Sequence, residues 1–227
     1  MGPDGAPLVA EYYRRRARHY EDFYAIPEHA GDLFSIRQWL TEHSHRSRIL
    51  EIAAGTGFWT RIVAVVAARI MATDINEQML MISAQRCSSP NIVYAVADAY
   101  RLPVFQAGAF DLAMAHHWWS HVPKERQRDF LEGIAIGLRA GTKLLMIDQC
   151  YVAGFSGDQA RVDGHGNRYE PRTLHDGTKF EIIKNYPSDT EIRAALSAFC
   201  SDIQIVRLRY FWALTGTLNH EANLSRG

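Results

Sequence analysis

Short apolar segments alternate with amphipathic ones along the middle of the chain, between residues 48 and 150. Five apolar segments have the length of strands: RILEIAA, RIMATDI, IVYAVAD, FDLAMAH and TKLLMIDQC. Segments between them, such as NEQMLMISAQRC and ERQRDFLEGIAIGLR, repeat their apolar residues at the helical period. Because a helix that joins two parallel strands buries its apolar stripe on the sheet, this pattern predicts an α/β fold. We expect a Rossmann-like, doubly wound, mostly parallel seven-stranded sheet with helices on both faces.

The segments on either side of this alternation predict additions to the sheet. Residues 8–24 are helical and aromatic-rich, and a second helix follows in which Leu33, Ile36 and Leu40 keep the helical period. The glycine-rich, charged stretch after the fifth strand predicts a loop or small insertion. Beyond it we expect a strand at FEIIKN, a helix at SDTEIRAALSAF capped by Ser188 or Asp189, and two tightly joined strands at IQIVRLRYFWALTGTL.

Composition excludes several classes of protein. With 227 residues, of which 47% are hydrophobic, the chain is long enough for one substantial core. The 25 basic and 25 acidic residues cancel, so no global field draws in nucleic acid or an anionic membrane. The basic run YYRRRARHY is flanked by acidic residues and is typical of a solvated helix face. No segment has the roughly 18 continuous apolar residues of a membrane span, and the start lacks a signal-peptide pattern, so we expect a cytoplasmic protein.

A glycine turn follows the first expected strand. The stretch EIAAGTG places Gly55 and Gly57 where the strand enters a helix, and at that edge of an open α/β sheet a glycine turn lets the backbone approach a nucleotide. A dinucleotide site would require a third glycine, but bulky Trp59 lies in that region. The pattern therefore argues against NAD.

Carboxylates follow the next two strands. Asp74 ends the second strand, seventeen residues after Gly57, and can accept hydrogen bonds from both ribose hydroxyls. Asp98 and Ala99 end the third strand, in a position to accept from an adenine amino group. Either carboxylate alone is commonly a helix cap. The glycine turn, Asp74 and Asp98 together form a more specific pattern, because they end three successive strands and each suits a different part of one nucleoside ligand.

In order and separation, the segments ILEIAAGTG, ATDINEQML, AVADAYRLP, FDLAMAHHWW and LRAGTKLLMID resemble the class I S-adenosylmethionine-dependent methyltransferases of the small-molecule type. The resemblance covers roughly residues 12–218. It implies that the glycine loop, with Glu51 beneath it, holds the methionine part, that Asp74 binds ribose and that Asp98 binds adenine. Ala53 departs from the family, which most often has glycine there. The cofactor-binding residues that we predict are Tyr13, Tyr20, Glu51, Ala53, Gly55, Gly57, Trp59, Asp74, Ile75, Met79, Asp98, Ala99 and His116.

The resemblance also implies how the single domain, residues 1–227, is organised. We expect an N-terminal helical lid (1–45), a cofactor-binding core (46–150), an insertion that forms a lid over the acceptor (151–180) and C-terminal strands and helix (181–227).

The stretch HHWWSH follows the fourth strand, beside the expected methyl group. Neighbours on an extended chain point opposite ways, so His116 and His117 are not expected to face the methyl group together. His117 and His121 are the candidate catalytic bases, and the alternative is that both histidines only hold the scaffold. Because no third ligand is spaced near this pair, we predict no metal site. The candidate substrate-binding residues are Trp118, Trp119, Tyr151, Phe155, Tyr169 and Arg172; Arg172, with Lys184 and Tyr169, could hold a polar or anionic acceptor.

These features predict methyl transfer from S-adenosylmethionine to an O or N atom of a small, aromatic or apolar metabolite. The chain lacks the Asn/Asp-Pro-Pro-Tyr/Phe run of methyltransferases that act on DNA bases or glutamine. The alternative is a non-catalytic S-adenosylmethionine-binding regulatory or partner subunit. We expect a small-molecule acceptor and neither nucleic acid nor membrane as a partner, and a homodimer is left open.

Overall fold

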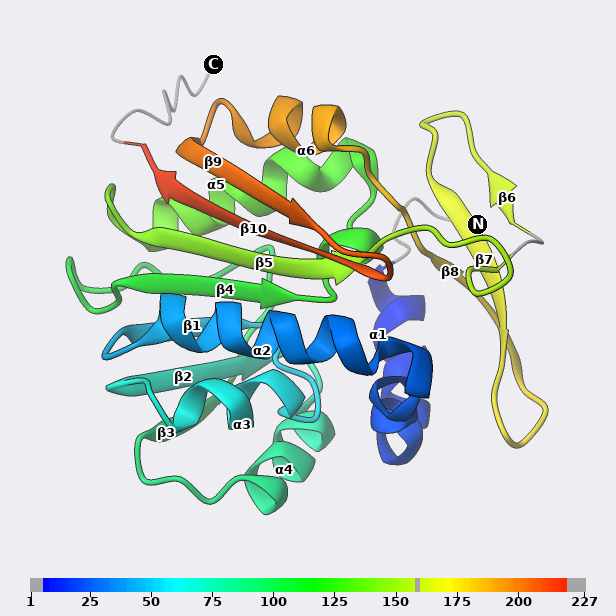
Figure 1. Ribbon diagram of the computed structural model, residues 1–227, viewed down its shortest axis with the longest axis horizontal. Coiled ribbons are helices and arrows are strands. Elements are labelled where there is room, and N and C mark those ends of the chain that lie inside the picture. The colour runs from blue at the N-terminus through cyan, green and yellow to red at the C-terminus, as the bar shows by residue number, and fades with distance from the viewer. Residues whose placement is uncertain (1–5, 158–159, 220–227) are drawn as a thin grey trace.

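The computed structural model describes residues 6–157 and 160–219. In that part of the chain a seven-stranded sheet has the strand order β3-β2-β1-β4-β5-β10-β9 (Figure 1). β10 pairs antiparallel with both β5 and β9, and the other strand pairs are parallel, so the predicted mostly parallel α/β sheet is confirmed. The strands are β1 (Arg48–Ile52), β2 (Arg69–Asp74), β3 (Ile92–Val96), β4 (Leu112–His116), β5 (Lys143–Gln149), β9 (Cys200–Arg207) and β10 (Phe211–Leu218).

Helices cover both faces of this sheet (Figure 1). On one face Leu33, Ile36 and Leu40 of α2 are buried with Val63 of α3, as the helical period predicts. On the other face, α5 and α6 pack together. No helix within the described residues is long and apolar enough to cross a membrane. The helices are α1 (Ala6–Arg16), α2 (Ala30–Ser44), α3 (Phe58–Ala64), α4 (Glu77–Arg86), α5 (Gln127–Gly137) and α6 (Asp189–Leu196), with 3-10 turns η1 (Ala17–Ala25), η2 (Pro27–His29), η3 (Trp119–His121) and η4 (Lys124–Arg126).

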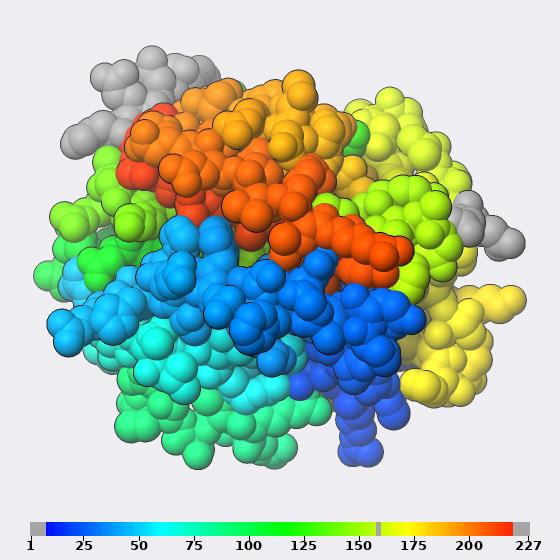
Figure 2. Space-filling view, viewed as in Figure 1, coloured from blue at the N-terminus to red at the C-terminus, as the bar shows by residue number. Residues whose placement is uncertain are grey.

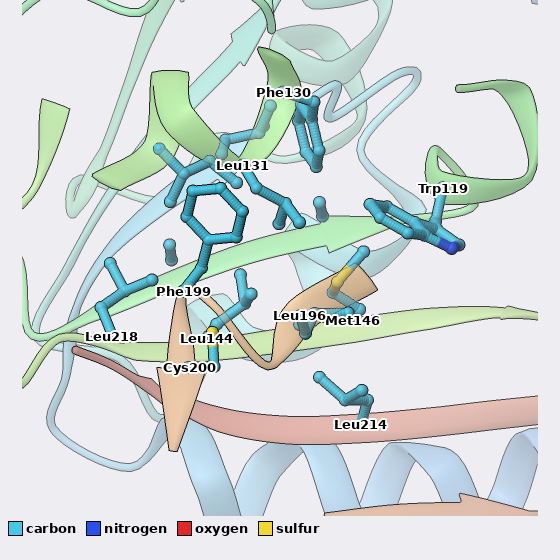
Figure 3. Packing of buried hydrophobic residues seen from close by; sticks show 14 of the residues in the cluster. Trp119, Phe130, Leu131, Leu144, Met146, Leu196, Phe199, Cys200, Leu214 and Leu218 are labelled. Atoms are coloured by element: carbon cyan, nitrogen blue, oxygen red, sulfur yellow. The ribbon is translucent and has the colours of Figure 1, made fainter. Parts of the chain in front are cut away.

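Strands β4 and β5, in the middle of the main sheet, are buried on both faces along most of their length. Successive residues of β4 alternate between the two cores, because Met114 belongs to the α2–α3 core and Ala115 to the α5–α6 core. Figure 3 shows the second core, in which Phe130 and Leu131 of α5 lie over Met146 of β5. Such double burial is what the near-continuous apolar runs predict for a covered parallel sheet.

The insertion after β5 is a small sheet rather than a loop. Three antiparallel strands form it: β6 (Arg161–Val162), β7 (Arg168–Thr173) and β8 (Lys179–Ile183). The strand predicted at FEIIKN exists, but as β8 it belongs to this second sheet. Helix α1 packs on the small sheet through Val9 and Tyr12, which are buried with Ile182. Figures 1 and 2 show the N-terminal segment, the chain after β5 and the β7–β8 hairpin gathered at one end of the molecule.

The C-terminal elements follow the sequence prediction closely. The Ser188 hydroxyl accepts from the Glu191 amide, and the Glu191 carboxylate accepts from the Ser188 amide, so the predicted helix start is a capping box. Strands β9 and β10 form the expected hairpin at the edge of the main sheet. Residues 220–227 of the predicted C-terminal part, residues 1–5 of the predicted lid and residues 158–159 of the insertion lie outside the described residues.

Candidate active site

The glycine turn after β1 is held in an unusual backbone conformation. Gly55 has φ +59° and Gly57 has φ +80°, a region that glycine enters at little cost. Gly57 also precedes α3 directly, and a Cβ atom there would lie 2.1 Å from the Ser83 Oγ of α4. Glycine at position 57 is therefore required both by the turn and by the contact between α3 and α4.

Ala53 shares the left-handed conformation. Its φ is 55°, although it carries a Cβ atom. For an L-residue this region costs roughly 1–2 kcal/mol. The glycine that the family most often has at this position therefore has a physical reason, and alanine fits here at the expense of backbone strain.

Asp74 ties the glycine turn to the end of β2. Its Oδ2 accepts from the Gly55 amide at 2.9 Å and its Oδ1 accepts from the Asn76 amide at 2.8 Å. The side chain is buried, and burial raises the pKa of this carboxyl above its ordinary value, although the backbone hydrogen bonds oppose the rise. Because each carboxylate oxygen can accept more than one hydrogen bond, Asp74 can still accept from a ligand.

The glycine turn, the ends of β2 and β3 and the N-terminal segment enclose a cavity of about 530 Å³, which we call the glycine-loop cavity. This volume lies in the ordinary range for small-ligand pockets. Ten of the predicted cofactor-binding residues line it: Tyr13, Tyr20, Ala53, Gly55, Asp74, Ile75, Met79, Asp98, Ala99 and His116.

Three predicted cofactor-binding residues do not line this cavity. Glu51 is buried under the turn, where it accepts from the Thr60 hydroxyl at 2.7 Å, and burial raises its pKa to about 8. Trp59 is buried and donates to the Tyr24 hydroxyl at 3.2 Å. Gly57 lies against Ser83. These three residues support the turn from below instead of lining the cavity.

A second cavity, of about 390 Å³, lies between the N-terminal segment and the small sheet, and we call it the lid cavity. Aromatic rings dominate its lining, and the two cavities share four residues: Tyr13, Tyr20, His117 and His121. The aromatic residues of the lid cavity are Tyr12, Tyr13, Tyr20, Phe23, Tyr24, Phe155, Tyr186 and Tyr210.

His117 lies where the two cavities meet, and its backbone is strained. Its φ is 55°, which breaks the extended course of β4, so His116 and His117 both line the glycine-loop cavity. The expectation of an extended chain at both histidines does not hold at His117, where the backbone is left-handed instead. His117 Nδ1 is 3.8 Å from Asp148 Oδ1, and its buried Nε2 has no hydrogen-bond partner among the described residues. Burial lowers the pKa of His117 to about 4, so the ring is neutral near pH 7.

His121 is fully engaged by two neighbours. Its Nδ1 is 2.6 Å from the Ile183 carbonyl oxygen, and because a carbonyl only accepts, Nδ1 must donate. Nε2 therefore carries the lone pair, which accepts from the Tyr13 hydroxyl at 2.7 Å. Burial lowers the pKa of His121 to about 3, so this neutral form persists near pH 7.

Asp148 at the end of β5 lies behind both histidines. It accepts from the Ser120 amide at 2.8 Å and from the Lys184 ammonium at 3.1 Å. Burial alone would raise the pKa of Asp148, but the charge of Lys184 and the nearby histidines hold it at about 2. The carboxylate therefore stays ionised beside His117.

Comparisons with known proteins agree with this geometry. A family model described as a methyltransferase domain matches residues 49–141. The fold is similar to that of DhpI solved in complex with SAH, at 25% identity and a TM-score of 0.77 over 93% of this chain and 96% of that one. The DhpI-SAM-HEP complex is similar at 26% identity and a TM-score of 0.76, over 95% and 99% of the two chains. The chain is a class I S-adenosylmethionine-dependent methyltransferase.

S-adenosylmethionine is accordingly the cofactor of the methyltransferase. The residues present suit it: the backbone of the glycine turn, Asp74 and Asp98 all line one cavity of sufficient size. The PH0226 protein of Pyrococcus horikoshii OT3, at 14% identity and a TM-score of 0.69 over 88% of this chain and 100% of that one, shares the fold. Among curated proteins none matches the sequence significantly.

Four of the six substrate-binding residues predicted for the methyltransferase lie outside the lid cavity, and their role stays a prediction. Trp119 is 1% exposed and packs near Phe130 in the hydrophobic core, as Figure 3 shows. Trp118 lines the glycine-loop cavity, and Tyr151 lines a separate surface pocket. Tyr169 donates to Asp163 and lines neither of the two cavities.

The remaining two of these residues, Phe155 and Arg172, do line the lid cavity of the methyltransferase. Sequence reasoning missed most of the other lining residues, above all Arg16, which it assigned to a solvated face. Arg14 and Arg15 do pair with half-buried Glu11, but Arg16 ends α1 and lines the cavity. The tyrosines on either side of this basic run were the sequence feature that could have indicated a cavity there.

One group of potential metal ligands exists in the described residues of the methyltransferase. His19, Asp22 and His175 are exposed, and their ligand atoms lie within 4.8 Å of one another; of the three, His175 also lines the lid cavity. The group is separate from His117 and His121, for which no metal is predicted.

Proposed function

We propose that the methyltransferase transfers the methyl group to an oxygen or nitrogen atom of a small acceptor that binds in the lid cavity. The observation that carries this proposal is the shared lining of the two cavities. A donor in the glycine-loop cavity and an acceptor in the lid cavity would meet at Tyr13, Tyr20, His117 and His121. Alignment of two reactants at one place is the main contribution that a protein makes to such a displacement.

The residues of the glycine-loop cavity suit the cofactor. S-adenosylmethionine, when bound, supplies a methyl group on a positively charged sulfur. Asp74 and Asp98 would accept hydrogen bonds from ribose and adenine, and Tyr20 closes the cavity over the glycine turn, with its ring 3.8 Å from where a Gly55 Cβ would lie. Tyr13 and Tyr20 come from the N-terminal segment, so this segment shields the reacting atoms from water.

The lining of the lid cavity supports an acceptor with a flat or apolar part. The rings of Phe23 and Tyr24 lie edge-on to His117, at centroid distances of 5.9 and 5.6 Å. Edge-to-face contacts of this kind add to the favourable burial of an aromatic group. The walls are therefore tyrosines and phenylalanines of the N-terminal segment, in place of the tryptophans expected from the sequence.

His117 is the residue best suited to take a proton from the acceptor. It is neutral near pH 7, it lines both cavities, and its Nε2 is free of any partner among the described residues. Asp148 is ionised and lies on the Nδ1 side, where its charge favours the imidazolium that forms when Nε2 gains a proton. His121 would act only through Tyr13, because its lone pair already accepts from that hydroxyl.

The complex of DhpI with SAM and HEP supports a ternary complex for this protein as well. A turnover experiment tests the proposal. The protein is incubated with methyl-labelled S-adenosylmethionine and a panel of phenols, amines and carboxylic acids, and methylated products are identified by mass spectrometry. We expect at least one O- or N-methylated product, which an Asp74→Asn variant makes more slowly. Methylation confined to carbon atoms, or no product although the cofactor binds, would contradict the proposal.

A further inference from the structure

The lid cavity is cationic. Its lining contains Arg16, Arg172 and Lys184, and no aspartate or glutamate belongs to that lining among the described residues. A cavity with cations and no carboxylates favours a ligand of negative charge. Which of the three cations are free to bind such a ligand depends on their existing partners.

Lys184 is already neutralised. Its ammonium is buried and donates to Asp148 Oδ1 at 3.1 Å and to the Ser120 hydroxyl at 2.8 Å. This ion pair fixes the floor of the site and leaves no net charge for a ligand.

Arg172 is only partly neutralised. It donates to Glu170 Oε2 at 2.5 Å, but Glu170 Oε1 also accepts from Arg168 at 3.2 Å and from the Tyr186 hydroxyl at 3.1 Å. One buried carboxylate is thus shared between two guanidinium groups, so this cluster carries a surplus positive charge.

Arg16 has no acidic partner in the described part of the chain. Its guanidinium donates to the Tyr12 hydroxyl at 3.1 Å. Its neighbours on α1 differ, because Arg14 and Arg15 both pair with Glu11 on the exposed side. Arg16 therefore brings an uncompensated charge into the lid cavity.

Arg16 and Arg172 line the same cavity as Tyr13. Burial raises the pKa of Tyr13 well above its ordinary value, and the charges of both arginines oppose that rise, so both charges act on its hydroxyl. Tyr13 in turn hydrogen-bonds to His121 at the junction of the two cavities. A group held between these arginines would lie beside the place where the acceptor must react.

We propose that Arg16 and Arg172 form an anion site in the lid cavity and that the acceptor carries an oxyanion, either a carboxylate or a phosphate group. The planar guanidinium groups suit both anions, since each can donate two parallel hydrogen bonds. Because Arg16 ends α1 and Arg172 lies on β7, one anion binds the N-terminal segment and the small sheet at the same time. The statement that the bound anion is the methyl acceptor rests on the proposed function. Binding of an anion at this site does not require methyl transfer.

The test measures binding rather than methyl transfer. Titration calorimetry with S-adenosylhomocysteine present compares benzoate, phenyl phosphate and neutral benzyl alcohol as ligands. We expect at least one anion to bind at least tenfold more tightly than the alcohol, and the stronger of the two identifies the oxyanion. Arg16→Met and Arg172→Met should each weaken that binding at least tenfold.

Arg15→Met and Arg161→Met are matched controls, because these exposed arginines lie on the same two segments and pair with Glu11 and Glu181. Their anion affinity should not change. Affinity for S-adenosylhomocysteine shows that each variant is folded. The anion site is overturned if the alcohol binds as well as both anions, if neither anion binds at millimolar concentration, or if folded Arg16→Met and Arg172→Met bind as the parent does. A protein that binds the anion yet methylates nothing would refute only the proposed function.

Discussion

The Tyr13 hydroxyl donates to His121 Nε2 at 2.7 Å, across 108 positions of the sequence. This bond joins the N-terminal segment to the turn after β4, at the junction of the two cavities. It also occupies the lone pair of His121, so the proposed function assigns proton transfer to His117.

Replacement of His117 should therefore slow methyl transfer more than replacement of His121. His117→Asn keeps a residue type that tolerates the left-handed backbone and removes the imidazole. We expect kcat to fall about 100-fold, in the range for loss of a general base. The cofactor affinity, measured by calorimetry, should change little. An unaltered kcat in a folded His117→Asn protein would assign His117 to the scaffold.

Tyr13→Phe should have a smaller effect, about tenfold on kcat, because it removes one hydrogen bond to a partner that acts indirectly. His121→Gln should give a similar loss, and the double variant should be no worse than either single one if the two residues act as a pair. Additive losses would show that the two side chains act separately.

Asp74→Asn should weaken binding of S-adenosylmethionine by about 10- to 100-fold, the range for loss of a hydrogen bond to a charged group. Asn cannot accept from both the Gly55 and Asn76 amides as the carboxylate does. Asp202→Asn is the control, because Asp202 is exposed on β9 and its backbone, with φ 52°, suits asparagine. Calorimetry measures both affinities, and equal values would remove Asp74 from the cofactor site.

Two glycine variants should differ in stability. Gly57→Ala combines a left-handed backbone with a clash against Ser83 and should cost about 2–5 kcal/mol of unfolding free energy. Gly55→Ala meets no atom closer than 3.7 Å and should cost only about 1–2 kcal/mol. Chemical denaturation measures both, and equal costs would show that the contact between α3 and α4 can relax.

Ala53→Gly should stabilise the protein by about 1 kcal/mol, because relief of the left-handed strain exceeds the entropy that glycine loses. The melting temperature should rise by about 2–4 °C for a chain of this size. A fall in the melting temperature would mean that the strain at Ala53 is already absorbed by its surroundings.

Acid should destabilise the fold through its buried histidines. Burial lowers the pKa values of His116, His117 and His121 to about 3, 4 and 3, below the ordinary value of 6.5. The unfolded chain therefore binds more protons between pH 6.5 and pH 4, and stability falls as pH falls, by up to about 1.4 kcal/mol per pH unit for each histidine. Glu51 opposes this trend, because its raised pKa of about 8 means that the folded state binds the extra proton.

Denaturation at pH 7 and pH 5 tests this prediction. The parent should lose stability at pH 5, and His117→Asn should lose less than the parent does. A parent whose unfolding free energy is the same at both values would contradict the burial of neutral histidines.

The order of elements and the cofactor site could be predicted because both depend on local pattern. Apolar periodicity fixes strands and helices, and parallel strands bring their ends to one edge, so Asp74 and Asp98 were placed from their positions alone. The burial of Trp119 in the core could not be predicted in this way. The left-handed turn at His117 ends the alternation of faces, and nothing in the sequence marks a histidine as the residue that adopts it.

The lid cavity was harder to predict because its walls come from segments that are far apart in the sequence. Arg16 directly follows Arg14 and Arg15 in the sequence. It differs from them in that it is the last residue of α1 and does not pair with Glu11. The strands of the small sheet are mostly polar, so no long apolar period marks them in the sequence, and α1 packs on them through Val9, Tyr12 and Ile182. Whether the chain forms a homodimer stays a prediction.

The range matched by the family model has a consequence for how acceptors can diversify. Residues 49–141 contain most of the glycine-loop cavity, but of the lid cavity's lining they contribute only His117 and His121. If the proposed function holds, residues 49–141 supply the donor site and the proposed base. The flanking segments then determine which acceptor binds, and they can change without altering the central strands of the main sheet.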